Sequence, residues 1–352
     1  MRLLLLVFVL SYLVVCGGLS GCAREAPDVL ALQQGKERAA QGDYDAAITQ
    51  FTKAIEINPN SAEAYYVRAL ARDKKGDLDG AIADFTKAIE INPNSAEVYY
   101  VRALARDKKG DLDGVIADCS KVIAINPNYA QAYNSRGLVR TTKGEFDNAI
   151  RDFNKAIEIN QNYAEAYSNR GVAEGGKGDR ENAVKDFTRA IEINPNLAEA
   201  YSNRGLAYDE KGDHDSAIRD FTRAIEISPN FAKAYYCRGI TYDNKGDRDS
   251  ALKDFTKAIE IEPKYAVAYL SRGNVHDDKG DFDGAISDYN KALEINPKLA
   301  LAYYNRAIAR NRRGDLEGAI SDYEEFLKLA PTDQLAPKAK ETIADLKKKL
   351  GK

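Results

Sequence analysis

The chain has 352 residues, of which 30% are charged, with 51 Lys and Arg against 54 Asp and Glu and a formal net charge of −3. This acidic and evenly mixed composition lacks the basic surplus that is typical of nucleic-acid-binding proteins, so we expect no nucleic acid among its ligands. A single hydrophobic core stops growing near this length, and the chain is therefore expected either to divide into domains or to repeat a small unit.

Residues 1–21 have the pattern of an export signal. Arg2 precedes an apolar run over residues 3–15, which is shorter than the roughly 20 apolar residues that a membrane-spanning helix needs. The segment ends in Leu19-Ser20-Gly21-Cys22, which resembles the lipobox of bacterial lipoprotein signal peptides. This resemblance implies cleavage before Cys22, lipid attachment to its thiol and anchoring of the mature protein to a membrane. The alternative is an uncleaved anchor in which the cysteine is incidental.

The residues after the cysteine bear on location. Ala23 follows Cys22, and by resemblance to enterobacterial sorting signals the absence of Asp at this position favours the outer membrane. We therefore expect a protein of the bacterial cell envelope, lipid-anchored at the outer membrane and facing the periplasm. Residues 22–27 are then the lipidated cysteine and a short linker, which keeps the rest of the chain close to the membrane.

Prolines recur at a constant interval along the rest of the chain. Eight of the ten prolines are separated by multiples of 34 residues, and Gln161 occupies the one missing position. A constant interval of this length predicts a repeat architecture. The nine units are residues 28–61, 62–95, 96–129, 130–163, 164–197, 198–231, 232–265, 266–299 and 300–333.

Each unit has the pattern of two helices. In residues 62–95, small and apolar side chains at helical spacing predict a first helix from Ala62 to Lys75. Gly76 is suited to end it, and Asp77 to cap a second helix that stops at an Asn-Pro-Asn turn. The sequence therefore predicts an all-α protein.

The units resemble the tetratricopeptide repeat family over residues 28–333. Every unit after the first has Tyr at the fourth position and a small residue at the eighth, and the second helix places alanines around an aromatic residue, as at Ala81, Phe85 and Ala88. Small side chains let helices cross closely, and the ring fills the space beside them. The resemblance implies a right-handed superhelix, or α-solenoid, of nine helical hairpins that stabilise one another. Residues 334–352 are expected to form a capping helix and tail.

Two charged positions vary together along the repeats. Every unit except the first has Arg at the seventh position and Asp at the twenty-third, whereas the first has Gln34 and Gln50. We therefore predict structural ion pairs, either within a repeat or across a junction between repeats. In the fifth and sixth units the partners are Arg170 with Asp186 and Arg204 with Asp220.

The third unit differs from the second at three core positions. Cys119 replaces the aromatic ring, while Val115 and Val122 replace alanines, so the total side-chain volume is roughly kept. This pattern predicts that Cys119 is a buried core residue and not a reactive thiol. Several repeats separate it from Cys237, so we expect no disulfide between them.

No pattern typical of an enzyme or a metal centre occurs in the sequence. His214 and His276 have no His or Cys at ligand spacing. Residues 77–80 resemble the opening of a calcium loop, but the Glu that would close such a loop is missing. A nucleophile elbow, a phosphate loop and a dinucleotide fingerprint are also missing. We therefore predict no catalytic residues, no metal and no cofactor.

The resemblance implies that the first helices line a concave groove, at positions two, five, six, nine, twelve and thirteen of each unit. Tyrosines, small polar groups and carboxylates at these positions favour extended or basic peptide segments. The alternative is that the polar residues only solvate a helix face. The candidate groove residues are Tyr66, Tyr100, Asn134, Ser168, Asn169, Ser202, Asn203, Asp209, Tyr236, Asp243, Asp277 and Tyr304.

Two functions follow as expectations from this resemblance. The first is a lipid-anchored scaffold that binds other proteins in the envelope, for assembly, secretion or pilus-type machinery. The second is a module that binds glycans or cell-wall material in the same groove, and a competing basic peptide would distinguish the two. Gly175-Gly176, near the end of a first helix, predicts either a hinge or a close approach of the ligand.

Overall fold

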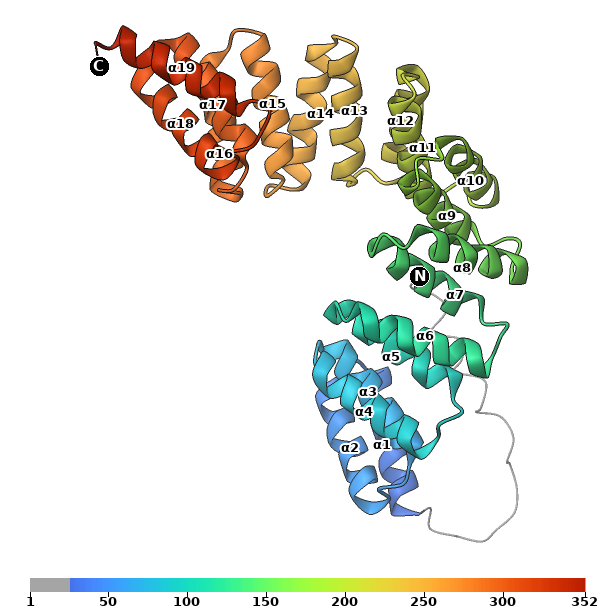
Figure 1. Cartoon of the computed structure of the whole chain (residues 1–352). Coiled ribbons are helices and arrows are strands. Elements are labelled where there is room, and N and C mark those ends of the chain that lie inside the picture. The colour runs from blue at the N-terminus through green and yellow to red at the C-terminus, as the bar shows by residue number, and fades with distance from the viewer. Residues whose placement is uncertain (1–25, 352) are drawn as a thin grey trace. The chain divides into compact units, whose positions relative to one another are not determined.

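The computed structural model describes residues 26–351, and all of their regular secondary structure is helical (Figure 1). The predicted all-α class is therefore confirmed for this part of the chain. It divides into two compact units, of which the first ends at Asn126 and the second begins at Pro127. The predicted signal, Cys22 and Ala23 lie outside the described residues.

The helices of the first unit form three hairpins, and neighbouring hairpins pack against one another. These helices are α1 (Pro27–Ala40), α2 (Tyr44–Ile57), α3 (Ala62–Lys75), α4 (Leu78–Ile91), α5 (Ala96–Lys109) and α6 (Leu112–Ile125).

The second unit continues the same pattern through six hairpins and one further helix. Its helices are α7 (Ala130–Thr142), α8 (Phe146–Ile159), α9 (Ala164–Gly176), α10 (Arg180–Ile193), α11 (Ala198–Glu210), α12 (His214–Ile227), α13 (Ala232–Asn244), α14 (Arg248–Ile261), α15 (Ala266–Asp278), α16 (Phe282–Ile295), α17 (Ala300–Arg313), α18 (Leu316–Leu329) and α19 (Ala336–Lys349).

Local residues explain where the helices begin and end. Gly76 ends α3 in the left-handed conformation, with φ 84°, which glycine adopts without a steric penalty. Asp77 then caps α4, because its side chain accepts a hydrogen bond from the backbone N–H of Gly80 at 2.9 Å. Both predicted roles are confirmed.

The core of each hairpin is built from small residues around one large ring. In the second repeat, Ala69, Ala81 and Ala88 are buried around Phe85. In the fifth repeat the contact is closer still, since a Cβ atom added at Gly171 would lie 2.8 Å from the Phe187 ring. The small residue at the eighth position therefore sets how closely the first helix can approach the ring of the second.

The third repeat has its predicted altered core. Cys119 is fully buried with Val115 and Val122. Cys237 is also buried, and burial raises the pKa of its thiol to about 11. Neither cysteine is in a disulfide within the described residues. The interpretation of Cys119 as a core residue is confirmed.

The two glycines near the end of α9 have different surroundings. A Cβ atom at Gly176 would lie 2.5 Å from the ring of Phe146 in the preceding repeat, whereas at Gly175 the nearest atom would be the Cβ of Ala183 at 4.0 Å. Packing within the chain therefore explains Gly176, and neither a hinge nor a ligand is needed to account for it. Gly175 has no such packing requirement.

Helix α19 covers the end of the second unit. Its buried residues Ala339, Ile343 and Leu346 pack in one cluster with Phe326 of α18, while most of its lysines are exposed. A final helix with one apolar and one charged face protects the last hairpin from water. The predicted capping helix is thus present.

Candidate functional site

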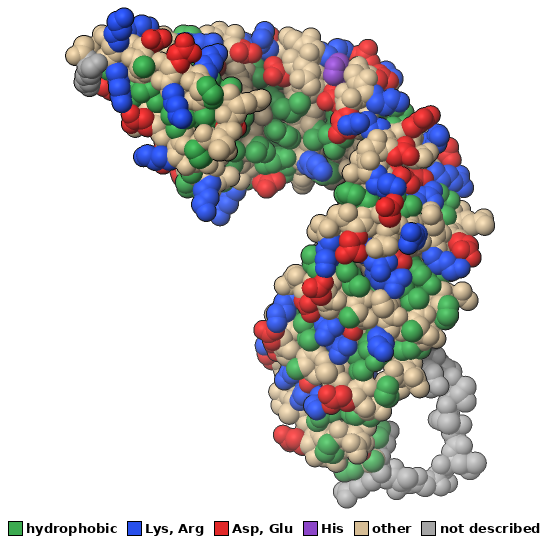
Figure 2. Space-filling view, viewed as in Figure 1, with side chains coloured by type: hydrophobic (Ala, Val, Ile, Leu, Met, Phe, Trp, Pro, Cys, Tyr) green, Lys and Arg blue, Asp and Glu red, His purple; other side chains and the backbone are tan. Residues whose placement is uncertain are grey.

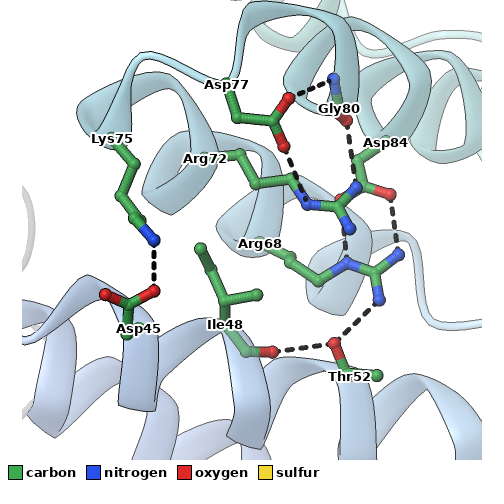
Figure 3. A network of polar contacts seen from close by, with 9 residues as sticks. All are labelled: Asp45, Ile48, Thr52, Arg68, Arg72, Lys75, Asp77, Gly80 and Asp84. Carbon is green, nitrogen blue, oxygen red and sulfur yellow. Dashed lines mark hydrogen bonds and ion pairs between the residues drawn. The ribbon is translucent and has the colours of Figure 1, made fainter.

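An ion pair joins the two helices of the second repeat. Nε and Nη2 of Arg68 donate to the two carboxylate oxygens of Asp84, each at 2.8 Å, and Nη1 donates to the hydroxyl of Thr52 at 3.0 Å (Figure 3). Thr52 belongs to the preceding repeat, on α2. One arginine therefore holds its own hairpin together and also links it to the neighbouring hairpin.

The four residues predicted as structural ion pairs adopt the same geometry. Arg170 donates to Asp186 at 2.7 and 2.6 Å, and Arg204 donates to Asp220 at 2.7 and 2.9 Å. The remaining guanidinium nitrogen bonds to the preceding repeat, to Asn154 at 2.5 Å and to Thr188 at 3.0 Å. The Arg–Asp pair therefore forms within the repeat, which is the first of the two predicted alternatives, and across the junction the same arginine contacts Asn154 or Thr188 and not an aspartate.

The recurring tyrosine at the fourth position belongs to this arrangement. The guanidinium carbon of Arg170 lies 5.4 Å from the ring centre of Tyr167, and that of Arg68 lies 5.6 Å from the ring centre of Tyr65. An arginine over an aromatic face gains cation–π stabilisation. These Arg–Asp–Tyr sets hold the hairpins in place and are structural in role.

Two predicted groove residues contact each other across adjacent first helices. Nδ2 of Asn169 on α9 donates to Oδ1 of Asn134 on α7 at 3.0 Å. One turn further along each helix, Leu138 and Val172 are 46% and 40% exposed. Asn203 is half-buried on the next first helix, α11. The first-helix face of these repeats therefore combines a pair of amides with accessible aliphatic side chains.

Three predicted groove residues are instead part of the interior. Ser168, Ser202 and Tyr304 are 6%, 1% and 5% exposed, so their prediction as accessible ligand contacts was wrong. All three occupy the fifth position, which lies one helical turn before the eighth and shares its face toward the second helix. Tyr304 accordingly packs edge-on against Tyr323 and Phe326, at ring distances of 5.4 and 5.1 Å.

The three other tyrosines at the fifth position are only partly buried. The ring of Tyr66 lies 6.1 Å from that of Phe85, and its hydroxyl donates to Glu97 at 2.9 Å. The ring of Tyr236 lies 5.1 Å from that of Tyr265. Tyr66, Tyr236 and Tyr100 are all half-buried, so a ligand could contact only their outer edges.

The acidic groove residues differ in their partners. Asp209 lies 2.7 Å from Nδ1 of His214, and Asp277 is paired with Arg312. The side chain of Asp243 has no hydrogen bond or ion pair with any residue from 26 to 351. Burial raises the pKa of the Asp243 carboxyl, and the negative charge of Asp278 raises it further.

A pocket of about 260 Å³ lies on α15, α16 and α17. Oδ1 of Asn274 is held there by two hydrogen bonds, from the hydroxyl of Tyr289 at 2.9 Å and from Nδ2 of Asn305 at 2.8 Å. Of the pocket residues, Asp277 belongs to the predicted groove set. Asn274 could have been noticed, because it replaces an aliphatic residue at the ninth position. The lining residues are Asn274, Asp277, Asp278, Tyr289, Asn305, Ile308 and Arg312.

The visible surface carries charges of both signs. Figure 2 shows Lys and Arg beside Asp and Glu over both units, with hydrophobic side chains between them. Within residues 26–351, no helix is long and apolar enough to cross a membrane. In the same part of the chain, no cluster of three His, Cys, Asp or Glu side chains could hold a metal ion.

Family models for the tetratricopeptide repeat match most of the chain. The matched segments are residues 32–96 and 74–130, 139–175 and 176–212, 198–231 and 232–265, 273–312, and 301–333. A comparison with the curated proteins gave no match to this sequence.

Three solved structures of similar fold have low sequence identity to the chain. A tetratricopeptide repeat protein from Parabacteroides merdae has a TM-score of 0.60 at 19% identity, covering 71% of this chain and 98% of that one. The APC/C hetero-tetramer Cut9–Hcn1 has a TM-score of 0.60 at 15% identity, covering 93% and 78%. PilF of Pseudomonas aeruginosa has a TM-score of 0.55 at 16% identity, covering 60% and 96%. At these identities the likeness is one of fold.

Proposed function

Because the chain belongs to the tetratricopeptide repeat family, we propose that it is a lipid-anchored scaffold that binds other proteins in the bacterial cell envelope. Binding, without catalysis, is its proposed activity. The first-helix face of the second unit is the proposed contact surface, and an extended segment of the partner is the proposed ligand. Among proteins of similar fold, Cut9 forms a hetero-tetramer with Hcn1.

The observation that carries this proposal is the surface over α7 and α9. The paired amides of Asn134 and Asn169 can both donate and accept hydrogen bonds, as a peptide backbone requires. Leu138 and Val172 beside them are exposed and give apolar area to bury. Such a combination binds an extended chain through its backbone and through alternate side chains.

A capture experiment tests the proposed surface. The full chain, purified in detergent and immobilised, is incubated with membrane extract of its native host. We expect the variant Asn134→Ala, Asn169→Ala to retain about tenfold less partner than the parent chain, which corresponds to a loss of roughly 1.4 kcal/mol in binding. Bound proteins are quantified by mass spectrometry after washing.

The matched control changes two asparagines of the inter-repeat turns. Asn162 and Asn196 are exposed there, away from the first-helix face, and the variant Asn162→Ala, Asn196→Ala should capture as much partner as the parent. Equal capture by all three proteins would place the binding surface elsewhere and contradict the proposal. Capture of glycan fragments by the parent, without protein, would favour the glycan-binding alternative.

The proposed lipid anchor rests on the sequence Leu19-Ser20-Gly21-Cys22. We expect Cys22→Ala to move from the detergent phase to the aqueous phase in phase partitioning, because the thiol that would take the lipid is gone. The variant Cys16→Ala is the control and should stay in the detergent phase, since Cys16 would leave with the signal. A Cys22→Ala protein that still partitions into detergent would instead indicate an uncleaved anchor.

A further inference from the structure

We infer that the pocket on α15, α16 and α17 is a subsite for one basic side chain, lysine or arginine, of the bound partner segment. This inference rests on the proposed function, because it names the residue type that one part of the binding surface selects. The pocket is formed by the first helices of the last two repeats together with Tyr289 of α16. Some polar groups of the pocket already have hydrogen-bond partners within the described residues, and others do not.

One carboxylate oxygen in the pocket lacks a hydrogen-bond partner. The Asp277 side chain is only 12% exposed, and while its Oδ2 is paired with Arg312, its buried Oδ1 contacts no donor among the described residues. A buried acceptor without a donor costs free energy, so an entering N–H group is favoured there. Burial also raises the pKa of the Asp277 carboxyl, an effect that the charge of Arg312 opposes.

The amide oxygen of Asn274 is not available to accept a hydrogen bond from a ligand. Oδ1 of Asn274 already accepts two hydrogen bonds, from Tyr289 and from Asn305, so both of its lone pairs are used. The carboxylates of Asp277 and Asp278 are therefore the strongest acceptors left for a ligand. Asp277 is paired with Arg312 and Asp278 with Arg248, whereas the neighbouring carboxylate of Asp243 has no ion pair in the described part of the chain. The group therefore keeps a net negative charge, which favours a cationic group over an anionic one.

The chain itself shows how a basic side chain binds at such a junction. At the junction of α3 and α5, Nζ of Lys108 lies 2.6 Å from Asp73, and at the junction of α15 and α17 Arg312 pairs with Asp277. In both cases a carboxylate at the twelfth position meets a cation at the thirteenth position of the next repeat. At the junction of α13 and α15, the thirteenth position is Asp278.

The junction of α13 and α15 therefore has two carboxylates where the junctions of α3 with α5 and of α15 with α17 have an ion pair. Asp243 has no ion pair with any residue in the described part of the chain, and Asp278 is paired only with Arg248, at 3.1 Å. The excess negative charge of this junction lies beside the pocket, because Asp278 is one of the pocket's lining residues. A lysine or arginine of the partner would supply the cation that this junction lacks.

The test uses the full chain in detergent and a defined probe. The probe is a fluorescently labelled Ser/Ala peptide with evenly spaced lysines, and its binding is followed by fluorescence anisotropy. The same peptide with norleucine in place of lysine keeps the apolar chain and removes the charge. We expect the lysine peptide to bind and the norleucine peptide to bind at least about tenfold more weakly, as expected when one partner of a buried charge pair is removed.

Two protein variants locate the binding. Asp277→Asn, Asp278→Asn should weaken the lysine peptide at least about tenfold, whereas Asp73→Asn should leave its affinity within about twofold, because Asp73 faces the cation Lys108 at its junction and Asp278 faces the carboxylate of Asp243. The control repeats the Asp277→Asn change at the same, twelfth position of another repeat. If loss of the Arg312 contact unfolds the double variant, as circular dichroism would show, Asp243→Asn, Asp278→Asn replaces it with the same expected loss.

The outcomes separate this inference from the proposed function. Equal binding of the lysine and norleucine peptides, or equal losses in the pocket variant and Asp73→Asn, would overturn the basic-residue subsite. If partner capture from the membrane extract then still depends on Asn134 and Asn169, the scaffold function stands and only the subsite fails. If, in addition, partner capture does not depend on Asn134 and Asn169, the proposed function is overturned as well.

Discussion

Replacing Arg170 with Gln is expected to destabilise the fifth repeat by about 3 kcal/mol, because the change leaves a buried carboxylate without its partner. Asp186 is only 7% exposed and receives two hydrogen bonds from Arg170. The same change also removes the bond from Arg170 to Asn154 of the preceding repeat. The loss should therefore appear both within the α9–α10 hairpin and at its junction with α8.

The double variant Arg170→Gln, Asp186→Gln is expected to recover much of that loss, since no unpaired charge remains buried. The first repeat provides the precedent, with Gln34 and Gln50 at the equivalent positions. Hydrogen exchange measured by mass spectrometry on α9 and α10 gives the local free energy of opening, which a single unfolding midpoint would average over the repeats. If the loss of local free energy in the double variant equals the sum of the losses in Arg170→Gln and Asp186→Gln, the pair is not coupled.

An exposed ion pair in the same hairpin is the control for this cycle. Arg189 and Glu192 lie one turn apart on α10 with a distance of 2.9 Å, and both side chains are about half exposed. Exposed pairs contribute little because water screens them and their side chains lose conformational freedom. The variants Arg189→Gln and Glu192→Gln should leave exchange in α9 and α10 nearly unchanged.

Replacing Cys119 with Phe is expected to destabilise the third repeat by about 1–3 kcal/mol, because the larger ring has no space in a filled core. Cys119, Val115 and Val122 are all buried, so the core has no exposed side toward which the ring could turn. Urea denaturation of the full chain, together with hydrogen exchange in α5 and α6, measures the loss.

The compensating variant for this change copies the core of the second repeat. Val115→Ala, Cys119→Phe, Val122→Ala restores the set found as Ala81, Phe85 and Ala88, and it should be close to the parent in stability. The comparison isolates volume, since the backbone pattern of the two repeats is the same. A single variant as stable as the parent would show that the third repeat has room for the ring, contrary to the expected packing.

Features that depend on residues close in the chain, or on changes that recur between repeats, could be predicted from the sequence alone. The 34-residue period, the glycine that ends each first helix and the aspartate that caps α4 are local, because turns and caps involve neighbours within about four positions. The Arg–Asp pairs were also predictable, since both positions change together in the first repeat. The core role of Cys119 could be inferred because Val115 and Val122, on the same helix, change with it and keep the side-chain volume roughly constant.

Which side of the first helix a ligand can contact depends instead on how the helices pack in three dimensions. Ser168, Ser202 and Tyr304 are polar or amphipathic residues that the sequence allows on either side, and packing against the second helix buries them. The role of Gly176 depends on Phe146 and one hydrogen bond of Asn274 depends on Asn305, each about 30 positions away in a neighbouring repeat, while the other hydrogen bond of Asn274 comes from Tyr289 on the second helix of its own repeat. No local pattern contains such contacts, because the distance between two adjacent repeats is set by the side chains that meet there.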